Sequence, residues 1–108
     1  MVAAEAPAGW PDKIVIRGHK WKLKYSHGLT DPGGTHLLGM CDWASRTICL
    51  DVDHPPESVL TTLFHEMTHA HFNYAPLLGV SDDNCEALCD YFGGMMADFI
   101  TLNKPWSP

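Results

Sequence analysis

Residues 53–73 read DHPPESVLTTLFHEMTHAHFN, and this segment carries the strongest structural signal in the chain. Asp53 supplies a capping side chain, two prolines follow in the first turn, and Glu57 places a carboxylate near the positive end of the helix dipole. Apolar residues then recur at intervals of three and four, the period of an amphipathic helix: Val59, Leu60, Leu63, Phe64, Met67 and Ala70. The segment therefore predicts a helix that runs to about Asn73.

The residues before this helix predict a small sheet. Short runs alternate apolar and polar side chains, as half-buried strands do. Four strands are expected: Lys13–Arg17, Lys20–Tyr25, Leu38–Trp43 and Thr47–Val52. Gly18-His19 suits a hairpin turn between the first two strands, and the last two meet at a turn near Ala44-Ser45-Arg46. Residues 26–36 hold three glycines and one proline and predict a loop.

A second helix is predicted to start near Ser81 or Asp82 and to run to about Leu102. Acidic residues occupy its first turn, and a Lys-Pro pair ends it. Gly93 and Gly94 lie inside this helix, where each costs about 1 kcal/mol relative to alanine. Either the first helix packs closely against these glycines, or the second helix breaks or kinks there.

A length of 108 residues fits a single domain. We expect an α+β fold in which a sheet of three to four mainly antiparallel strands packs on the two helices. Residues 1–12 are expected to form a flexible tail, 13–104 the domain, and 105–108 a second tail. No apolar run has the length of a transmembrane helix, and the N-terminus lacks the basic and apolar regions of a signal peptide, so we expect a cytoplasmic protein.

The formal net charge of −6 is unevenly distributed. The first 30 residues carry five basic and two acidic side chains, whereas the remaining 78 carry two basic and eleven acidic ones. An acidic bulk argues against binding of nucleic acid. Lys20, Lys22 and Lys24 alternate with apolar residues and are expected on one solvated strand face; a nucleic-acid-binding adaptor that uses these lysines is the alternative.

The four cysteines are expected to be buried, reduced thiols. No pair has the two-residue gap typical of zinc knuckles, and a reducing compartment disfavours disulfides. They are Cys41, Cys49, Cys85 and Cys89.

The residues that could bind a metal ion lie in His65-Glu66-Met67-Thr68-His69, an H-E-x-x-H motif. Residues four apart lie one turn apart on the same helix face, so both imidazoles can reach one metal ion. Glu66, beside the first histidine, is then placed to act as general base on a water molecule at the ion. The chain holds seven histidines, and these two carry the prediction of a metal site.

A catalytic zinc usually takes three protein ligands. The extended motif with a third histidine is excluded, because Phe72 replaces its glycine and Ala75 replaces its histidine. After the motif the only glutamate is Glu86, on the second predicted helix, and Asp90 follows one turn later. A solvated acidic face is the alternative reading of this pair.

The Glu86/Asp90 helix resembles that of the gluzincin-type zincins, and the element order over about residues 13–103 resembles the small ImmA/IrrE-type metallopeptidases of phages and prophages. The resemblance implies a zincin-like minimal core that holds one Zn²⁺ ion through His65, His69 and Glu86. It also implies that Asp90 orients one of the motif histidines, with His69 favoured; a register in which Asp90 is the ligand is the alternative.

The function so predicted is a zinc-dependent metallopeptidase that hydrolyses peptide bonds of a protein or peptide substrate, with Glu66 as general base. His36 is the candidate for a substrate or oxyanion contact, because it precedes the strand expected to border a cleft. Tyr74 and Tyr91 are further candidate oxyanion donors, although a role as ordinary core or surface tyrosines is favoured for both. The alternative function is a metal-binding regulatory or interaction module without turnover. No membrane partner is expected, and the sequence does not predict an oligomeric state.

Overall fold

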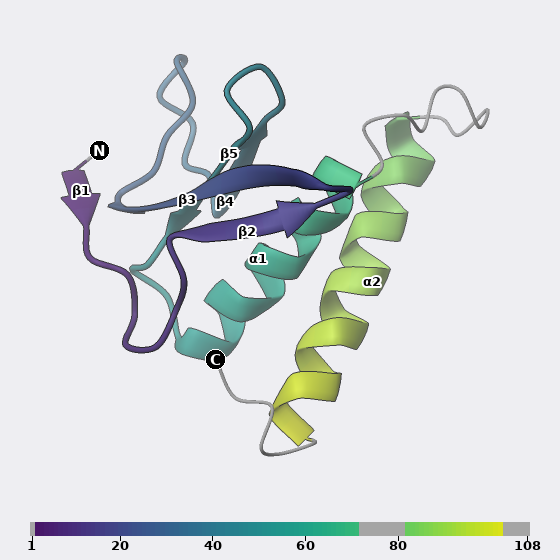
Figure 1. The fold of residues 1–108 in the computed structure, drawn as a ribbon. Helices are drawn as coiled ribbons and strands as arrows, with labels where there is room; N and C mark the ends of the chain where they lie inside the picture. Colours follow the sequence, from purple (N-terminus) through teal and green to yellow (C-terminus); the bar gives the residue numbers. More distant parts are fainter. Residues whose placement is uncertain (1, 72–81, 103–108) are drawn as a thin grey trace.

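The computed structural model describes residues 2–71 and 82–102, which form five strands and two helices (Figure 1). In chain order these are β1 (Val2–Ala4), β2 (Lys13–Ile16), β3 (His19–His27), β4 (Gly39–Asp42), β5 (Thr47–Asp51), α1 (Pro56–His71) and α2 (Asp82–Leu102). The α+β class is confirmed. Within the described ranges, neither helix is long and apolar enough to cross a membrane.

The strands form one mixed sheet in the order β1-β3-β5-β4, with β2 also paired to β3. The expectation of three to four strands is wrong, because the described sheet has five. Mainly antiparallel pairing is confirmed, since three of the four strand pairs in the described residues are antiparallel, and β3 pairs with β5 in parallel. The parallel pairing arises because residues 28–38 carry the chain past β3 to the far edge. There β4 forms, and β5 returns between β4 and β3.

The predicted hairpin between the first two strands is confirmed, with its turn one residue earlier than expected. Ile16 pairs with His19, so Arg17 and Gly18 form a two-residue loop. Both have positive φ, 51° and 80°. This is the backbone geometry of a type I′ turn, whose twist matches that of the strands it joins.

The N-terminal segment is not the loose tail expected from its composition. Val2–Ala4 pairs antiparallel with the C-terminal half of β3, beyond the four residues that pair with β2. The Tyr25 hydroxyl also donates a hydrogen bond to the carbonyl of Pro11 at 2.6 Å. β3 is longer than expected, and its last residues offer backbone groups that β1 satisfies.

The core lies between the sheet and α1. On β3, Trp21, Leu23 and Tyr25 are buried, whereas the three lysines between and before them are exposed, as the alternation predicted. The fully buried Ile48 and Leu50 of β5 join the same cluster, and α1 contributes an apolar face to it. Burial of each such side chain stabilises the fold by roughly 1.5–3 kcal/mol.

Helix α1 starts at Pro56, and Asp53 does not cap it. The N–H groups of Ser58 and Val59 donate to the carbonyl of Pro55. The Asp53 carboxylate instead contacts His27 Nδ1 at 2.6 Å and accepts a hydrogen bond from the N–H of Gly28 at 3.1 Å. A tertiary contact thus uses the side chain that the sequence pattern assigned to the helix end.

Helix α2 lies beside α1 and runs in the opposite direction (Figure 1). It continues through both glycines, so the predicted break is excluded. A Cβ atom on Gly93 would lie 2.9 Å from the backbone nitrogen of His65 and 3.1 Å from the carbonyl oxygen of Thr61. The predicted close approach is therefore confirmed at Gly93, whereas at Gly94 a Cβ would meet nothing within 4 Å.

Cys41, Cys49 and Cys89 form no disulfide; Cys89 is fully buried as expected, whereas Cys41 and Cys49 are only partly buried. Burial raises the pKa of Cys41 to about 12 and also raises that of Cys49. These thiols are consequently protonated and unreactive near neutral pH. The side chain of Cys85 lies outside the described residues, as do residues 72–81 and 103–108, which include the predicted end of the first helix near Asn73 and the C-terminal tail.

The two glycines give a matched pair for testing the helix contact. We expect Gly93→Ala to lower the free energy of unfolding by about 1–3 kcal/mol, because its methyl group meets the backbone of α1. Gly94→Ala should raise it by up to about 1 kcal/mol through helix propensity. Denaturant unfolding of both variants measures this, and equal effects would contradict the contact.

Candidate metal centre

The motif histidines lie on the side of α1 that faces α2. Their Nε2 atoms are 3.1 Å apart, and the ring centroids are separated by 4.8 Å. The spacing of four residues therefore brings both imidazoles to one point, as predicted. Both side chains are mostly buried, at 16% and 18% exposure.

Glu86 of α2 reaches both histidines. Its Oε1 lies 2.9 Å from His65 Nε2, and its Oε2 lies 3.0 Å from His69 Nε2. The carboxylate thus spans the two nitrogen atoms from the neighbouring helix. The contact depends on the close packing of the helices at Gly93, two turns along α2.

Asp90 contacts His65 and not the favoured His69. Its Oδ1 lies 2.8 Å from His65 Nδ1, the ring nitrogen that faces away from His69. Since α2 runs opposite to α1 (Figure 1), the later of the two acidic residues on α2 meets the earlier histidine on α1. An acceptor on this nitrogen fixes the tautomer that leaves Nε2 free to bind a metal.

The donor set fits a zinc ion. Two ligand atoms about 2.0–2.1 Å from one tetrahedral zinc are roughly 3.3 Å apart, close to the separations of 2.9–3.1 Å among His65 Nε2, His69 Nε2 and the Glu86 oxygens. Ligand atoms also cluster in the sets His65-Glu66-His69 and His65-Glu86-Asp90. Burial lowers the pKa of His69, which favours the neutral imidazole that a metal requires.

Glu66 is a buried carboxylate beside this cluster. It is 7% exposed, and burial raises its pKa to about 7, with the negative charge of Glu86 adding to the shift and His65 opposing it. A carboxylate with a pKa near neutrality can both accept and return a proton under ordinary conditions. The residue predicted as general base therefore lies in an environment suited to that role.

Two adjoining cavities open at the cluster, with volumes of about 380 and 280 Å³. Both are lined by His65, Glu66, Glu86 and Gly39 of β4; the larger is also lined by Thr61 and Thr62, and the smaller by His69. Gly39 keeps β4 close to α1, because a Cβ there would lie 2.6 Å from Thr62 Cγ2 and 3.0 Å from Glu66 Cγ. The cleft thus lies between an edge strand and the motif helix.

The candidate oxyanion contacts are placed differently. His36 lines the larger cavity, and its Nε2 lies 3.4 Å from that of His54. Tyr91 is exposed on α2 and packs edge-on against Phe92, and Tyr74 lies outside the described residues. Sequence reasoning missed His54 and Asp51 as neighbours of His36; the run Asp51-Val-Asp-His54, which begins at the last residue of β5, is the signal that could have pointed to them.

Comparisons with protein families, curated proteins and solved structures found no match to this chain.

The burial of Glu66 predicts a pH-dependent stability in protein treated with a chelator. Its folded-state pKa of about 7 exceeds its ordinary value of 4.5, so the stabilising contribution of protonated Glu66 is complete below about pH 4.5 and is lost as the pH rises through 7. Glu66→Gln has no proton to lose. Relative to the wild type, its free energy of unfolding should therefore rise by about 2–3 kcal/mol over this range.

Denaturant unfolding between pH 4.5 and 8 measures the difference, with Glu57→Gln at the exposed start of α1 as the control. A wild-type-to-variant difference that stays constant with pH would contradict an ionisable carboxylate buried at position 66.

Proposed function

We propose that the protein is a zinc-dependent metallopeptidase of the zincin type, similar to the ImmA/IrrE-type enzymes of phages and prophages, and that it acts in the cytoplasm. The observation that carries the proposal is the convergence of His65, His69 and Glu86 beside the buried Glu66. Three potential ligands and a base from two helices, at the floor of a cleft, are what hydrolysis of a peptide bond requires.

The ligand set is His65 Nε2, His69 Nε2 and the Glu86 carboxylate. When bound, zinc lowers the pKa of a water molecule toward neutrality and polarises the carbonyl of the scissile bond. Asp90 accepts from His65 Nδ1 and so holds that ring in place. We assign ligation to Glu86 because its carboxylate reaches both histidines, whereas Asp90 contacts the far ring nitrogen of His65.

Glu66 carries the proton. Its carboxylate accepts a proton from the attacking water and then donates it to the amine that leaves when the peptide bond breaks. Because the side chain is almost fully buried beside the cleft, the proton is held close to the reacting groups and away from bulk water.

The edge strand β4 indicates the class of substrate. β4 pairs on one side with β5, and residues from Gly39 to Cys41 line the cavities at the motif. Unpaired backbone groups of an edge strand bind extended peptide backbone by strand addition. An unfolded or looped segment of a protein is therefore the proposed substrate.

A metal-binding regulatory module is the second candidate function. The ligand cluster itself is compatible with it, since binding a metal without turnover needs only His65, His69 and Glu86. Glu66 argues against it, because a purely structural zinc site has no need of a buried, ionisable carboxylate beside its ligands.

Zinc content and hydrolysis should separate the roles of the motif residues. His65→Ala is expected to lose the zinc bound at the motif, because it removes one of three ligands. Glu66→Gln should keep that zinc and lower cleavage of an unfolded protein such as casein by at least about 100-fold. Metal analysis and a peptide-release assay measure this. Unchanged zinc content in His65→Ala contradicts the metal site, and full activity in Glu66→Gln contradicts the base.

A second pair of variants distinguishes ligand from orienting residue on α2. Glu86→Gln should abolish stoichiometric zinc at the motif, whereas Asp90→Asn should keep the stoichiometry and weaken zinc affinity about 10–100-fold. Competition with a chelating dye measures the affinities. The reverse order of effects would show that Asp90 is the ligand.

A further inference from the structure

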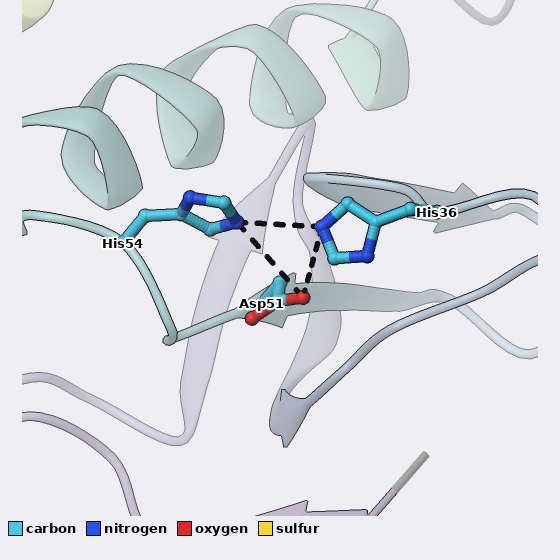
Figure 2. A group of neighbouring side chains, drawn as sticks. All are labelled: His36, Asp51 and His54. Carbon is cyan, nitrogen blue, oxygen red and sulfur yellow. Dashed lines mark hydrogen bonds and ion pairs between the residues drawn. The ribbon is translucent and has the colours of Figure 1, made fainter.

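A second cluster of potential metal ligands lies apart from the motif histidines. It consists of His36, Asp51 and His54, which converge from three segments (Figure 2). His36 lies in the loop before β4, Asp51 is the last residue of β5, and His54 lies just before α1. Asp51 and His54 are three residues apart, and the fold brings His36, which precedes His54 by 18 residues, to them.

The facing atoms form a small triangle. His36 Nε2 lies 3.4 Å from His54 Nε2 and 3.4 Å from Asp51 Oδ2, and His54 Nε2 lies 4.0 Å from the same oxygen. Donors about 2.0–2.1 Å from one tetrahedral zinc are roughly 3.3 Å apart. The observed triangle is therefore nearly the size that a single ion needs, and small side-chain movements would close its longest edge.

The carboxylate of Asp51 is held in a fixed position by the surrounding backbone. Its side chain is fully buried, and two backbone groups fix its carboxylate: the N–H of Leu29 donates to Oδ2 at 3.0 Å, and the N–H of Asp53 donates to Oδ1 at 2.8 Å. A buried carboxylate is held at a large desolvation cost unless positive charge is near. Oδ2 keeps lone-pair capacity toward the two imidazoles.

The histidines leave the triangle accessible from solvent. The side chains of His36 and His54 are 52% and 29% exposed, so an ion can enter without unfolding the protein. With no ion present, the two Nε2 atoms face each other, and at most one of them can donate a proton to the other. A cation replaces this weak contact with two coordinate bonds.

We propose that His36, Asp51 and His54 bind a second zinc ion. Two imidazoles and one carboxylate are donors that suit zinc, and the exposed side leaves a fourth position for water. The ion joins the loop that lines the larger cavity to the end of β5 and to the start of α1. Its role is to fix the wall of the cleft, and the proposal stands whether or not the motif site hydrolyses peptides.

Zinc stoichiometry of the full chain tests this site. Protein stripped with a chelator is titrated with Zn²⁺ in a calorimeter, and bound metal is counted after dialysis. We expect two equivalents in the wild type, one in His36→Ala, one in His54→Ala and none in His36→Ala combined with His65→Ala. His19→Ala is the matched control, since it removes an exposed histidine from the start of β3 and should keep two equivalents.

The outcomes separate this site from the motif site. A single equivalent that is lost in His36→Ala and kept in His65→Ala supports the second site and contradicts the first. Wild-type stoichiometry in both His36→Ala and His54→Ala, with folding verified by circular dichroism, overturns the second site.

A measurement on the wild type covers the case in which the variants fail to fold. Zinc should shift the imidazole NMR signals of His36 and His54 and leave those of His19 unchanged. Unshifted signals of His36 and His54 at saturating zinc overturn the proposal.

Discussion

The backbone contact between α1 and α2 is the constraint on which the rest of the site depends. Gly93 lets the second helix approach so closely that an added methyl group would lie 2.9 Å from the backbone of His65. One carboxylate of α2 can then span both motif histidines, and the next acidic residue along the same face can reach the outer nitrogen of His65. A wider helix pair would leave Glu86 and Asp90, whose side chains are 58% and 72% exposed, without their histidine partners, so the glycine sets the contacts of residues one and two turns away.

Both clusters place carboxylate groups next to histidine side chains. At the motif, the carboxyl groups of Glu66, Glu86 and Asp90 lie beside two histidines. Burial lowers the pKa of one of these histidines, His69. At the second cluster, a fully buried Asp51 faces two histidines. In each cluster one carboxylate, that of Glu66 or Asp51, is buried next to histidine side chains. A divalent cation is the simplest group that satisfies such a set of donors.

The sheet decides where substrate and ions can reach these donors. Because β5 inserts between β3 and β4, β4 becomes the edge next to α1, and Gly39 holds it close to the motif helix. The same crossover brings the loop that carries His36 over the end of β5, where Asp51 lies. One topological feature therefore forms the cleft wall and assembles the second cluster. It also explains why the two clusters adjoin the same cavity, which His36 and the motif residues line together.

Local spacing was enough to predict three features: the helix at 56–71, the H-E-x-x-H pair, and the alternation of lysines with Trp21, Leu23 and Tyr25. Each of these features depends on residues within one or two helical turns or along one strand. The close approach at Gly93 was also predictable, since a glycine inside a helix needs a compensating contact. Tertiary structure alone decided which histidine Asp90 contacts and that β3 and β5 pair in parallel. It also decided that residues 2–4 form a strand and that His36 lies beside Asp51 and His54. Each of these depends on the relative direction of elements distant in the chain, and no periodicity within a segment records that direction.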